Sequence, residues 1–212
     1  MRAPSLRPAV LAPLVLALAV ALLEGCAGAK APEPAKPRQS ATSIAGRWVS
    51  QSCEPQAAMG QQTRFHMVRE VNATDTDWSI TASVYEDAAC RTPLFSIFLE
   101  GPYDIGRASA TVPGAHEAIL GFKRKLIVAH HPRMVETFNR YRCANMEWAV
   151  GKSGDVSATG CMNTQPITAA CPHEFELVRI DGDRLYFGQR TGDMCHEPGR
   201  PKALNPLPLL KR

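Results

Sequence analysis

The stretch WSITASVY, residues 78–85, decides the fold class of this chain. Its apolar residues occupy every second position and are Trp78, Ile80, Ala82 and Val84. Ser, Thr and Tyr residues fill the other positions. An alternation with a period of two predicts a β-strand that buries one face and exposes the other. The stretch therefore predicts a strand of a sheet whose two faces differ.

Further strands are predicted on both sides of this stretch. Residues 94–99, with the sequence LFSIFL, are nearly all apolar, which predicts a strand that is central or buried on both faces. Asp181-Gly182 lies between two apolar runs, at 175–180 and 184–188, and predicts a hairpin. The other predicted strands are residues 44–50, 64–71, 108–112, 117–128 with a bend at Gly121, 146–150 and 156–161.

One helix is predicted among the strands, over residues 131–141. Pro132 suits a first helical turn, and the apolar residues that follow at helical spacing are Met134, Val135, Phe138 and Tyr141. About nine or ten strands with one short helix predict a mainly β fold, a strongly curved antiparallel sheet or a β-barrel that is lipocalin-like in general shape. We expect the helix to lie on the sheet or to close one mouth of the barrel, and Trp48 to plug the barrel floor.

The first 26 residues have the features of a lipoprotein signal peptide. Arg2 and Arg7 precede an apolar core at residues 10–23, and the small residue Gly25 stands before Cys26. The apolar core is shorter than the ~20 residues that a transmembrane helix needs. We expect lipidation of Cys26 to anchor an exported protein to the membrane, at the periplasmic face of the outer membrane or at the cell surface. The segment 27–29 (AGA) fits the small-x-small site of ordinary signal peptidase. Cleavage there is the alternative, and it would give a plain secreted protein.

The rest of the chain is predicted to be a tether and one domain. Residues 27–43 are rich in Pro, Ala and Lys without apolar periodicity, which predicts an extended, disordered tether. Residues 44–212 are predicted to form a single disulfide-stapled domain. The chain has 24 Lys and Arg against 20 Asp and Glu, and this balance excludes a strongly basic nucleic-acid binder.

Either route of processing leaves six structural cysteines. An even number in an exported domain predicts three disulfides among Cys53, Cys90, Cys143, Cys161, Cys171 and Cys195. Fifteen pairings are possible, and the sequence alone does not choose among them. Proximity along the chain favours Cys53–Cys90, with the other four cysteines paired within the C-terminal half.

No catalytic or metal-binding motif stands out. Phosphate-binding glycine loops, Gly-x-Ser-x-Gly and His-Glu-x-x-His are absent, so we expect neither an enzyme nor a cofactor. The segments 171–173 (CPH) and 194–196 (MCH) suggest a copper or haem site, but disulfides with adjacent surface histidines are commoner in an oxidising compartment. His130-His131 fits a helix start better than a metal site. The carboxylates of Glu54, Asp87 and Glu117 show no catalytic spacing.

The predicted barrel offers an interior for a hydrophobic or acylated ligand. A barrel of this size can keep an apolar interior that side chains do not entirely fill. The candidate lining residues are Trp78, Ile80, Val84, Phe95, Ile97, Phe98 and Trp148, and ordinary core packing is the alternative for each. Residues 123–125 (KRK) are interpreted as a basic strand edge that deters association, with contact to anionic lipid as the alternative.

A wider pattern resembles a known family. Residues 46–48 (GRW) resemble the Gly-x-Trp opening of lipocalins. The longer series 46–50 (GRWVS), 53–54 (CE), 63–64 (TR), 85–87 (YED), 90–93 (CRTP), Gly101, 171–172 (CP) and 185–188 (LYFG) resembles the domain of the adenomatosis polyposis coli down-regulated one family. Its animal members are membrane-attached extracellular inhibitors of Wnt signalling that carry the domain twice. The resemblance implies a β-barrel-like domain with an apolar cavity for the lipid of acylated Wnt, and a disulfide between Cys53 and Cys90.

These observations predict a non-enzymatic cell-envelope lipoprotein that binds a hydrophobic or acylated ligand. The alternative is a structural or assembly lipoprotein whose barrel surface engages an envelope protein. A periplasmic hydrolase or metalloprotein is the third class, and it has the least support.

Overall fold

The computed structural model of this chain describes residues 43–56, 65–162, 164–190 and 192–212. The predicted signal peptide, Cys26 and residues 27–42 of the predicted tether lie outside these ranges. Within them, no helix combines the length and the apolar content that are needed to cross a bilayer.

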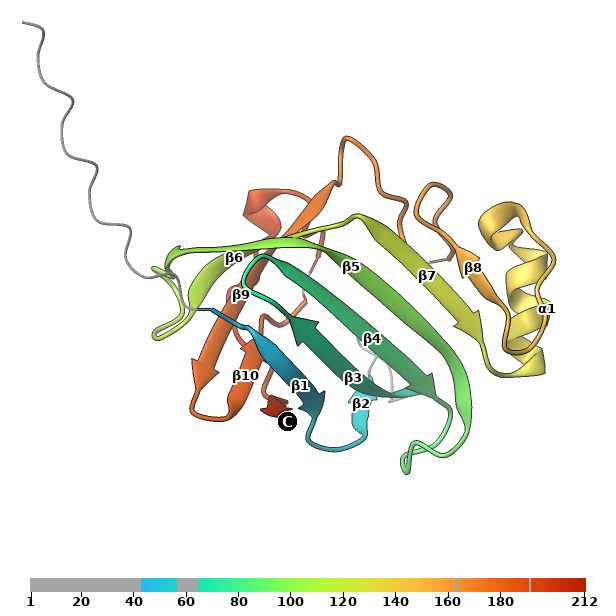
Figure 1. The fold of residues 1–212 in the computed structure, drawn as a ribbon, viewed down its shortest axis with the longest axis horizontal. Coiled ribbons are helices and arrows are strands. Elements are labelled where there is room, and N and C mark those ends of the chain that lie inside the picture. Colours follow the sequence, from blue (N-terminus) through green and yellow to red (C-terminus); the bar gives the residue numbers. More distant parts are fainter. Residues whose placement is uncertain (1–42, 57–64, 163, 191) are drawn as a thin grey trace, which may run out of the picture. The chain divides into compact units, whose positions relative to one another are not determined.

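The described chain is mainly β (Figure 1). Its elements in chain order are β1 (Gly46–Ser50), β2 (Glu54–Gln56), β3 (Phe65–Ala73), β4 (Asp77–Tyr85), β5 (Pro93–Ala108), β6 (His116–Gly121), β7 (Arg124–Ala129), α1 (Pro132–Arg140), η1 (Cys143–Asn145), β8 (Ser153–Asp155), β9 (His173–Asp181), β10 (Arg184–Phe187), η2 (Glu197–Gly199) and β11 (Leu209–Lys211). The two η elements are short 3-10 helices.

Eight strands close into an antiparallel barrel. The order around it is β1-β3-β4-β5-β6-β9-β10-β11, and β11 pairs back with β1. Because the ring is closed, each of its eight strands has a pairing partner on both sides. The predicted fold class, a mainly β barrel with one short helix, is therefore confirmed.

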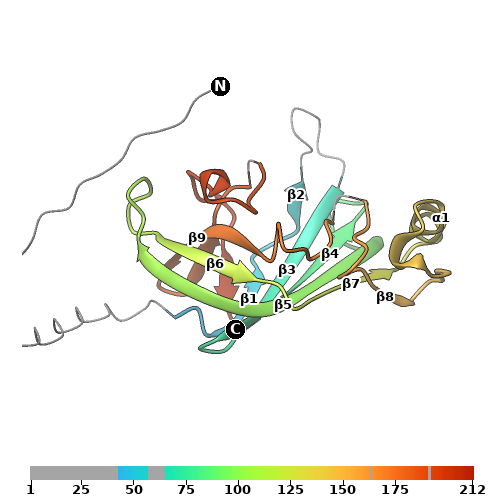
Figure 2. The same cartoon turned by 90° about the horizontal axis from the view of Figure 1, so that it is seen from above.

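β5 is the branch point of the sheet, because two halves of it pair with different strands along the same edge. Residues 95–100 pair with β7, whereas residues 103–108 pair with β6. β7 carries β8 on its other side, so the two form an extension beyond the barrel ring (Figure 2). At the branch point a Cβ on Gly101 would lie 2.1 Å from the carbonyl oxygen of Gly121, so only glycine allows this approach. Trp78 Nε1 donates to the same carbonyl at 3.1 Å.

Two strand predictions fail beside this branch. Residues 117–128 do not form one bent strand but divide into β6 and β7, because each pairs with a different half of β5. Residues 109–112 are a turn and not a strand. The Ser109 hydroxyl accepts hydrogen bonds from the backbone N–H groups of Thr111 and Val112, and this local bonding competes with a strand ladder.

The strand predictions at 146–150 and 156–161 are also wrong, and the short β8 lies between them. Trp148 is buried through loop contacts, since its backbone N–H donates to Asn139 Oδ1 and its indole N–H donates to the Cys143 carbonyl. The apolar side chain of Trp148 therefore packs into the core from a loop and not from a strand. Gly160 adopts a left-handed φ of 67°, which ends extended structure there.

The hairpin and the helix are confirmed. β9 and β10 are joined through Gly182, which has a φ of 60°. His131 precedes α1, and its Nδ1 accepts a hydrogen bond from the Arg133 N–H at 3.1 Å, as expected of a helix start. The helix buries Met134 and Phe138 beside β5 and β7, so it lies on the sheet extension and does not close a barrel mouth (Figure 1).

Three disulfides cross-link the domain, as predicted. Cys53–Cys90 joins the start of β2 to the turn between β4 and β5, which confirms the pairing favoured by chain proximity. The other pairs, Cys143–Cys161 and Cys171–Cys195, both lie in the C-terminal half. Three disulfides indicate a protein that is exported to an oxidising compartment.

Candidate functional site

The barrel strands define an inner face that continues onto the extension. On β4 the inner face carries the apolar residues of the WSITASVY stretch. Strand register places them opposite β5 residues in the pairs Ile80 with Leu99, Ala82 with Ile97, and Val84 with Phe95. Directly paired residues of antiparallel strands project to the same side of the sheet. The six residues Ile80, Ala82, Val84, Phe95, Ile97 and Leu99 therefore form one continuous apolar surface, which we call the inner strip.

The inner strip joins two closed hydrophobic clusters. The barrel cluster contains Trp48 and Trp78, with Ile80 and Leu99 packed against it. The second cluster lies under α1 and contains Phe138 and Trp148, with Val84, Phe95 and Ile97 packed against it. Every residue of the strip is only partly buried. Apolar side chains that are left partly open between two sealed cores form a surface on which an apolar guest can pack.

The structure brings together most, but not all, of the predicted lining residues. Ile80, Val84, Phe95 and Ile97 belong to the strip. Trp78 is on the inner face beyond one end of the strip, and it is buried in the barrel cluster. Trp148 covers the other end and packs against Gly154, where a Cβ would lie 2.5 Å from the indole ring. Phe98 is on the opposite face, because it pairs with Thr81 and Leu126 between two inner-face positions.

Lys125 lies at the barrel end of the strip. It is the cross-strand partner of Leu99 and is only 5% exposed. Its Nζ donates to the Gln165 carbonyl at 3.0 Å and lies 4.0 Å from the centroid of the Phe122 ring. Burial lowers the pKa of the Lys125 ammonium. Lys123 and Arg124 are exposed and pair with Asp77 and Asp155, whereas the interpretation of 123–125 as a basic edge is wrong for the buried Lys125.

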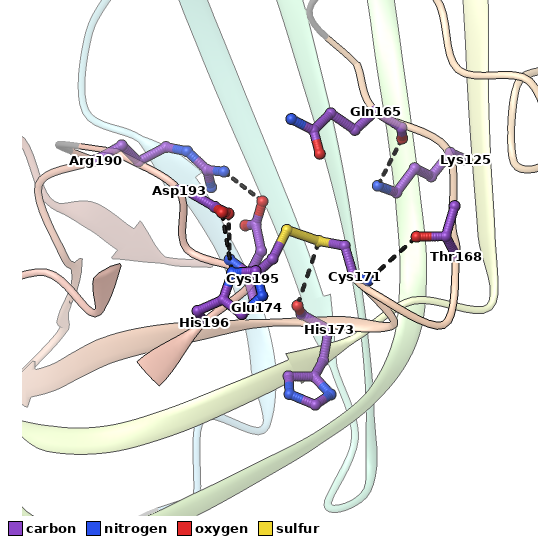
Figure 3. Close-up of a disulfide and its surroundings, with 10 residues drawn as sticks. All are labelled: Lys125, Gln165, Thr168, Cys171, His173, Glu174, Arg190, Asp193, Cys195 and His196. Carbon is purple, nitrogen blue, oxygen red and sulfur yellow. Dashed lines mark hydrogen bonds and ion pairs between the residues drawn. A yellow bond between two sulfur atoms is a disulfide. The ribbon is translucent and has the colours of Figure 1, made fainter. Parts of the chain in front are cut away.

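Glu174 of β9 lies near Lys125 and favours its charged form, and Glu176 follows two residues later on the same strand. Figure 3 shows Lys125 on one side and the Glu174–Arg190 ion pair on the other, with the Cys171–Cys195 disulfide between them in this view. Glu176 is buried, and burial raises its pKa to about 7. Two backbone N–H groups, of Leu177 and Gly188, donate to Glu176 Oε1 and partly offset this effect.

A fully paired buried cation occupies another part of the inner face. Arg69 pairs with Ala82 in the strand register, and Glu54 is its carboxylate partner. The guanidinium donates from Nε to both carboxylate oxygens at 3.1 and 2.9 Å and from a terminal nitrogen to Oε1 at 2.9 Å. Ser50 Oγ donates to the same carboxylate at 2.7 Å. This ion pair joins β1, β2 and β3.

The other candidate groups have local partners. Asp87 accepts N–H groups of the following turn, and Glu117 pairs with Arg107, so neither forms a dyad with Glu54. His196 pairs with Asp193, and the ring of His173 packs edge-on against Phe175. In the described ranges no three His, Cys, Asp or Glu side chains converge as a metal site would require.

A separate surface pocket of about 780 Å³ lies beside the Cys143–Cys161 disulfide. It contains none of the predicted lining residues. Exposed Tyr141 and Met162 contribute to its wall. Four non-glycine residues around it have left-handed backbone conformations, and these are Arg142, Ala144, Asn145 and Met162. No signal in the sequence pointed to this pocket, because such conformations carry no periodic pattern.

The geometry defines a class of protein: an oxidised, closed antiparallel barrel with a sheet extension that continues its apolar inner face. The family model described as Adenomatosis polyposis coli down-regulated 1 matches residues 30–185, which is more than half of the chain. This chain therefore belongs to that family. The family resemblance predicted from the sequence is confirmed.

Proposed function

We propose that this protein is a non-enzymatic binding module of the cell envelope that holds the acyl chain of a hydrophobic ligand on the inner strip. The observation that carries the proposal is the strip itself, where six apolar side chains in cross-strand register remain partly open between two sealed clusters. Core strands normally seal such a face completely.

The energetics of burial support this proposal. Each buried methylene contributes about 0.8 kcal/mol, so ten methylenes contribute about 8 kcal/mol before the costs of association. After those costs, micromolar to sub-millimolar affinity follows without any strong polar contact.

Two neighbouring positions on β4 provide a matched test. Ala82 is the smallest residue of the strip and lies at its middle, whereas Thr81 is on the opposite face of the same strand. We expect Ala82→Trp to fill the strip and to reduce binding of a fluorescent fatty acid at least about tenfold. Thr81→Trp, the control, should bind as the wild type does. Wild-type protein that binds no fatty acid, or an Ala82→Trp variant that binds it normally while folded, contradicts the proposal.

We further propose that Cys26 is lipidated and holds the domain at the periplasmic face of the outer membrane or at the cell surface. The signal-like sequence before Cys26 and the three disulfides support export by this route. Mass spectrometry of the mature protein tests it. A diacylated or triacylated N-terminal Cys26 is expected, and an unmodified N-terminus within residues 27–30 would show ordinary signal cleavage instead.

A further inference from the structure

Lys125 is a buried cation at one end of an apolar surface. Its position opposite Leu99 places the side chain where the inner strip meets the barrel cluster. The ammonium has three N–H donors, and the Gln165 carbonyl accepts one of them. The ring face of Phe122 covers another side of the ammonium. The hydrogen-bonding capacity of Lys125 thus exceeds what its described neighbours use.

The charge of Lys125 is also incompletely compensated. Among the described residues, no carboxylate lies within the 4.0 Å of an ion pair with Lys125. Glu174 is the nearby acid that favours its charged form, but Glu174 is itself paired with Arg190. Arg69, on the same inner face, has its own carboxylate. A buried charge is costly unless it is paired, so Lys125 is the cation of this face that gains most from an incoming anion.

We propose that Lys125 binds the carboxylate of a long-chain fatty acid whose acyl chain lies along the inner strip. The inference rests on the proposed function and adds a head-group class and an orientation to it. The carboxylate lies at the barrel end beside Leu99, and the chain extends over Ile97 towards Phe95 and the cluster under α1. These β5 positions span four residue steps, which is about 14 Å of strand.

A carboxylate fits this position because it is small and carries its charge at the end of the chain. The Glu174–Arg190 ion pair lies on the other side of the Cys171–Cys195 disulfide from Lys125 (Figure 3), and Lys125 is itself buried, so a small head group is favoured. A fatty acid carboxylate can accept hydrogen bonds from the two N–H groups of Lys125 that no described residue accepts, while its chain packs on the strip. A neutral ester of the same chain keeps the apolar contacts and loses the charge-assisted hydrogen bonds.

A fatty acid and its methyl ester, compared below their aggregation concentrations, test the inference. We expect the wild type to bind the acid about tenfold more tightly than the ester. Lys125→Met should bind both with the affinity that the wild type has for the ester. Lys123→Met removes an exposed lysine from the same chain segment and should keep the preference for the acid.

Each outcome separates this inference from the proposed function. Equal affinity of the wild type for acid and ester overturns the role of Lys125 and leaves the strip as a site for neutral chains. A preference that survives in Lys125→Met also overturns it. Failure of the wild type to bind either compound refutes the proposed function and this inference with it. The wild-type comparison requires no variant, so a folding defect in Lys125→Met leaves the test intact.

Discussion

Removal of Arg69 tests whether the buried ion pair with Glu54 holds the barrel closed. The Glu54 side chain is almost completely inaccessible, with the residue 1% exposed, and Arg69 is 8% exposed. Arg69 also donates to the Leu207 carbonyl at 3.0 Å, just before β11, the strand that completes the ring. The pair therefore connects β1, β2 and β3 to the segment that leads into β11.

The expected loss follows from what Arg69→Met leaves behind. The Glu54 carboxylate loses three short guanidinium contacts and keeps one described donor, the Ser50 hydroxyl. Breaking a buried pair by removing one partner costs about 3–5 kcal/mol, because the remaining charge has no compensation. The double variant Glu54→Leu/Arg69→Met removes both charges and should regain most of this loss, since apolar residues often replace a buried pair without cost.

Urea unfolding of the oxidised domain, followed by tryptophan fluorescence, measures both variants. We expect a lower midpoint at an unchanged m-value for Arg69→Met, because the surface exposed on unfolding is the same. In a domain of this size the melting temperature should fall by about 10 °C. A loss below about 1 kcal/mol, or a double variant no more stable than Arg69→Met, would refute the reasoning.

Three further predictions concern the barrel and its cross-links. Burial raises the pKa of Glu176 to about 7, so the folded state binds this proton more tightly than the unfolded state. The contribution of Glu176 to stability should therefore be fully present below pH ~4.5 and should fall by up to about 3 kcal/mol as the pH rises through 7. Urea titrations between about pH 5 and pH 8 should show this slope, and Glu176→Gln should remove it. Gly101→Ala places a methyl group against the Gly121 carbonyl and should lower the free energy of unfolding by about 1–3 kcal/mol. Gly106→Ala on the same strand, where the nearest atom would lie 3.6 Å from the new Cβ, should cost less in thermal unfolding. Equal losses for the two variants would contradict the branch-point explanation. Replacement of Cys53 and Cys90 by Ser should lower the free energy of unfolding by about 4 kcal/mol under oxidising conditions, and no change would show that this cross-link does not restrain the unfolded chain.

The fold class was predictable because most strands have one buried face. The alternation in residues 78–85, the Asp181-Gly182 hairpin signal and the Pro132 helix start each depend on neighbours close in sequence, and each is confirmed. β11 was missed because three residues are too few to show a period. The division of 117–128 into two strands depends on β5, which is distant in sequence and offers two different partners.

The candidate site was predicted in part, because only the pattern within each strand can be read from residues that are close in sequence. Alternation within a strand places Ile80 and Val84 on one face, but the period of two also places Phe98 on the face opposite to Phe95 and Ile97. The nearly continuous apolar run at 94–99 concealed this alternation. Lys125 carries a usable signal, because it lies two residues before Ile127 and four before Ala129, both buried on the inner face. The charges of its neighbours suggested a solvated edge instead.

The branching of β5 explains how an open apolar strip can exist beside a stable barrel. Residues 103–108 of β5 pair with β6 in the ring, whereas residues 95–100 pair with β4 of the ring on one side and with β7 on the other. The inner face of residues 95–100 continues onto β7 through the pairs of Phe95 with Ala129, Ile97 with Ile127, and Leu99 with Lys125. Stability thus resides in the closed ring and the Arg69–Glu54 pair, and the partly open surface lies on β4 and on the half of β5 that pairs with β7. A substitution such as Ala82→Trp should accordingly change ligand affinity more than it changes the free energy of unfolding.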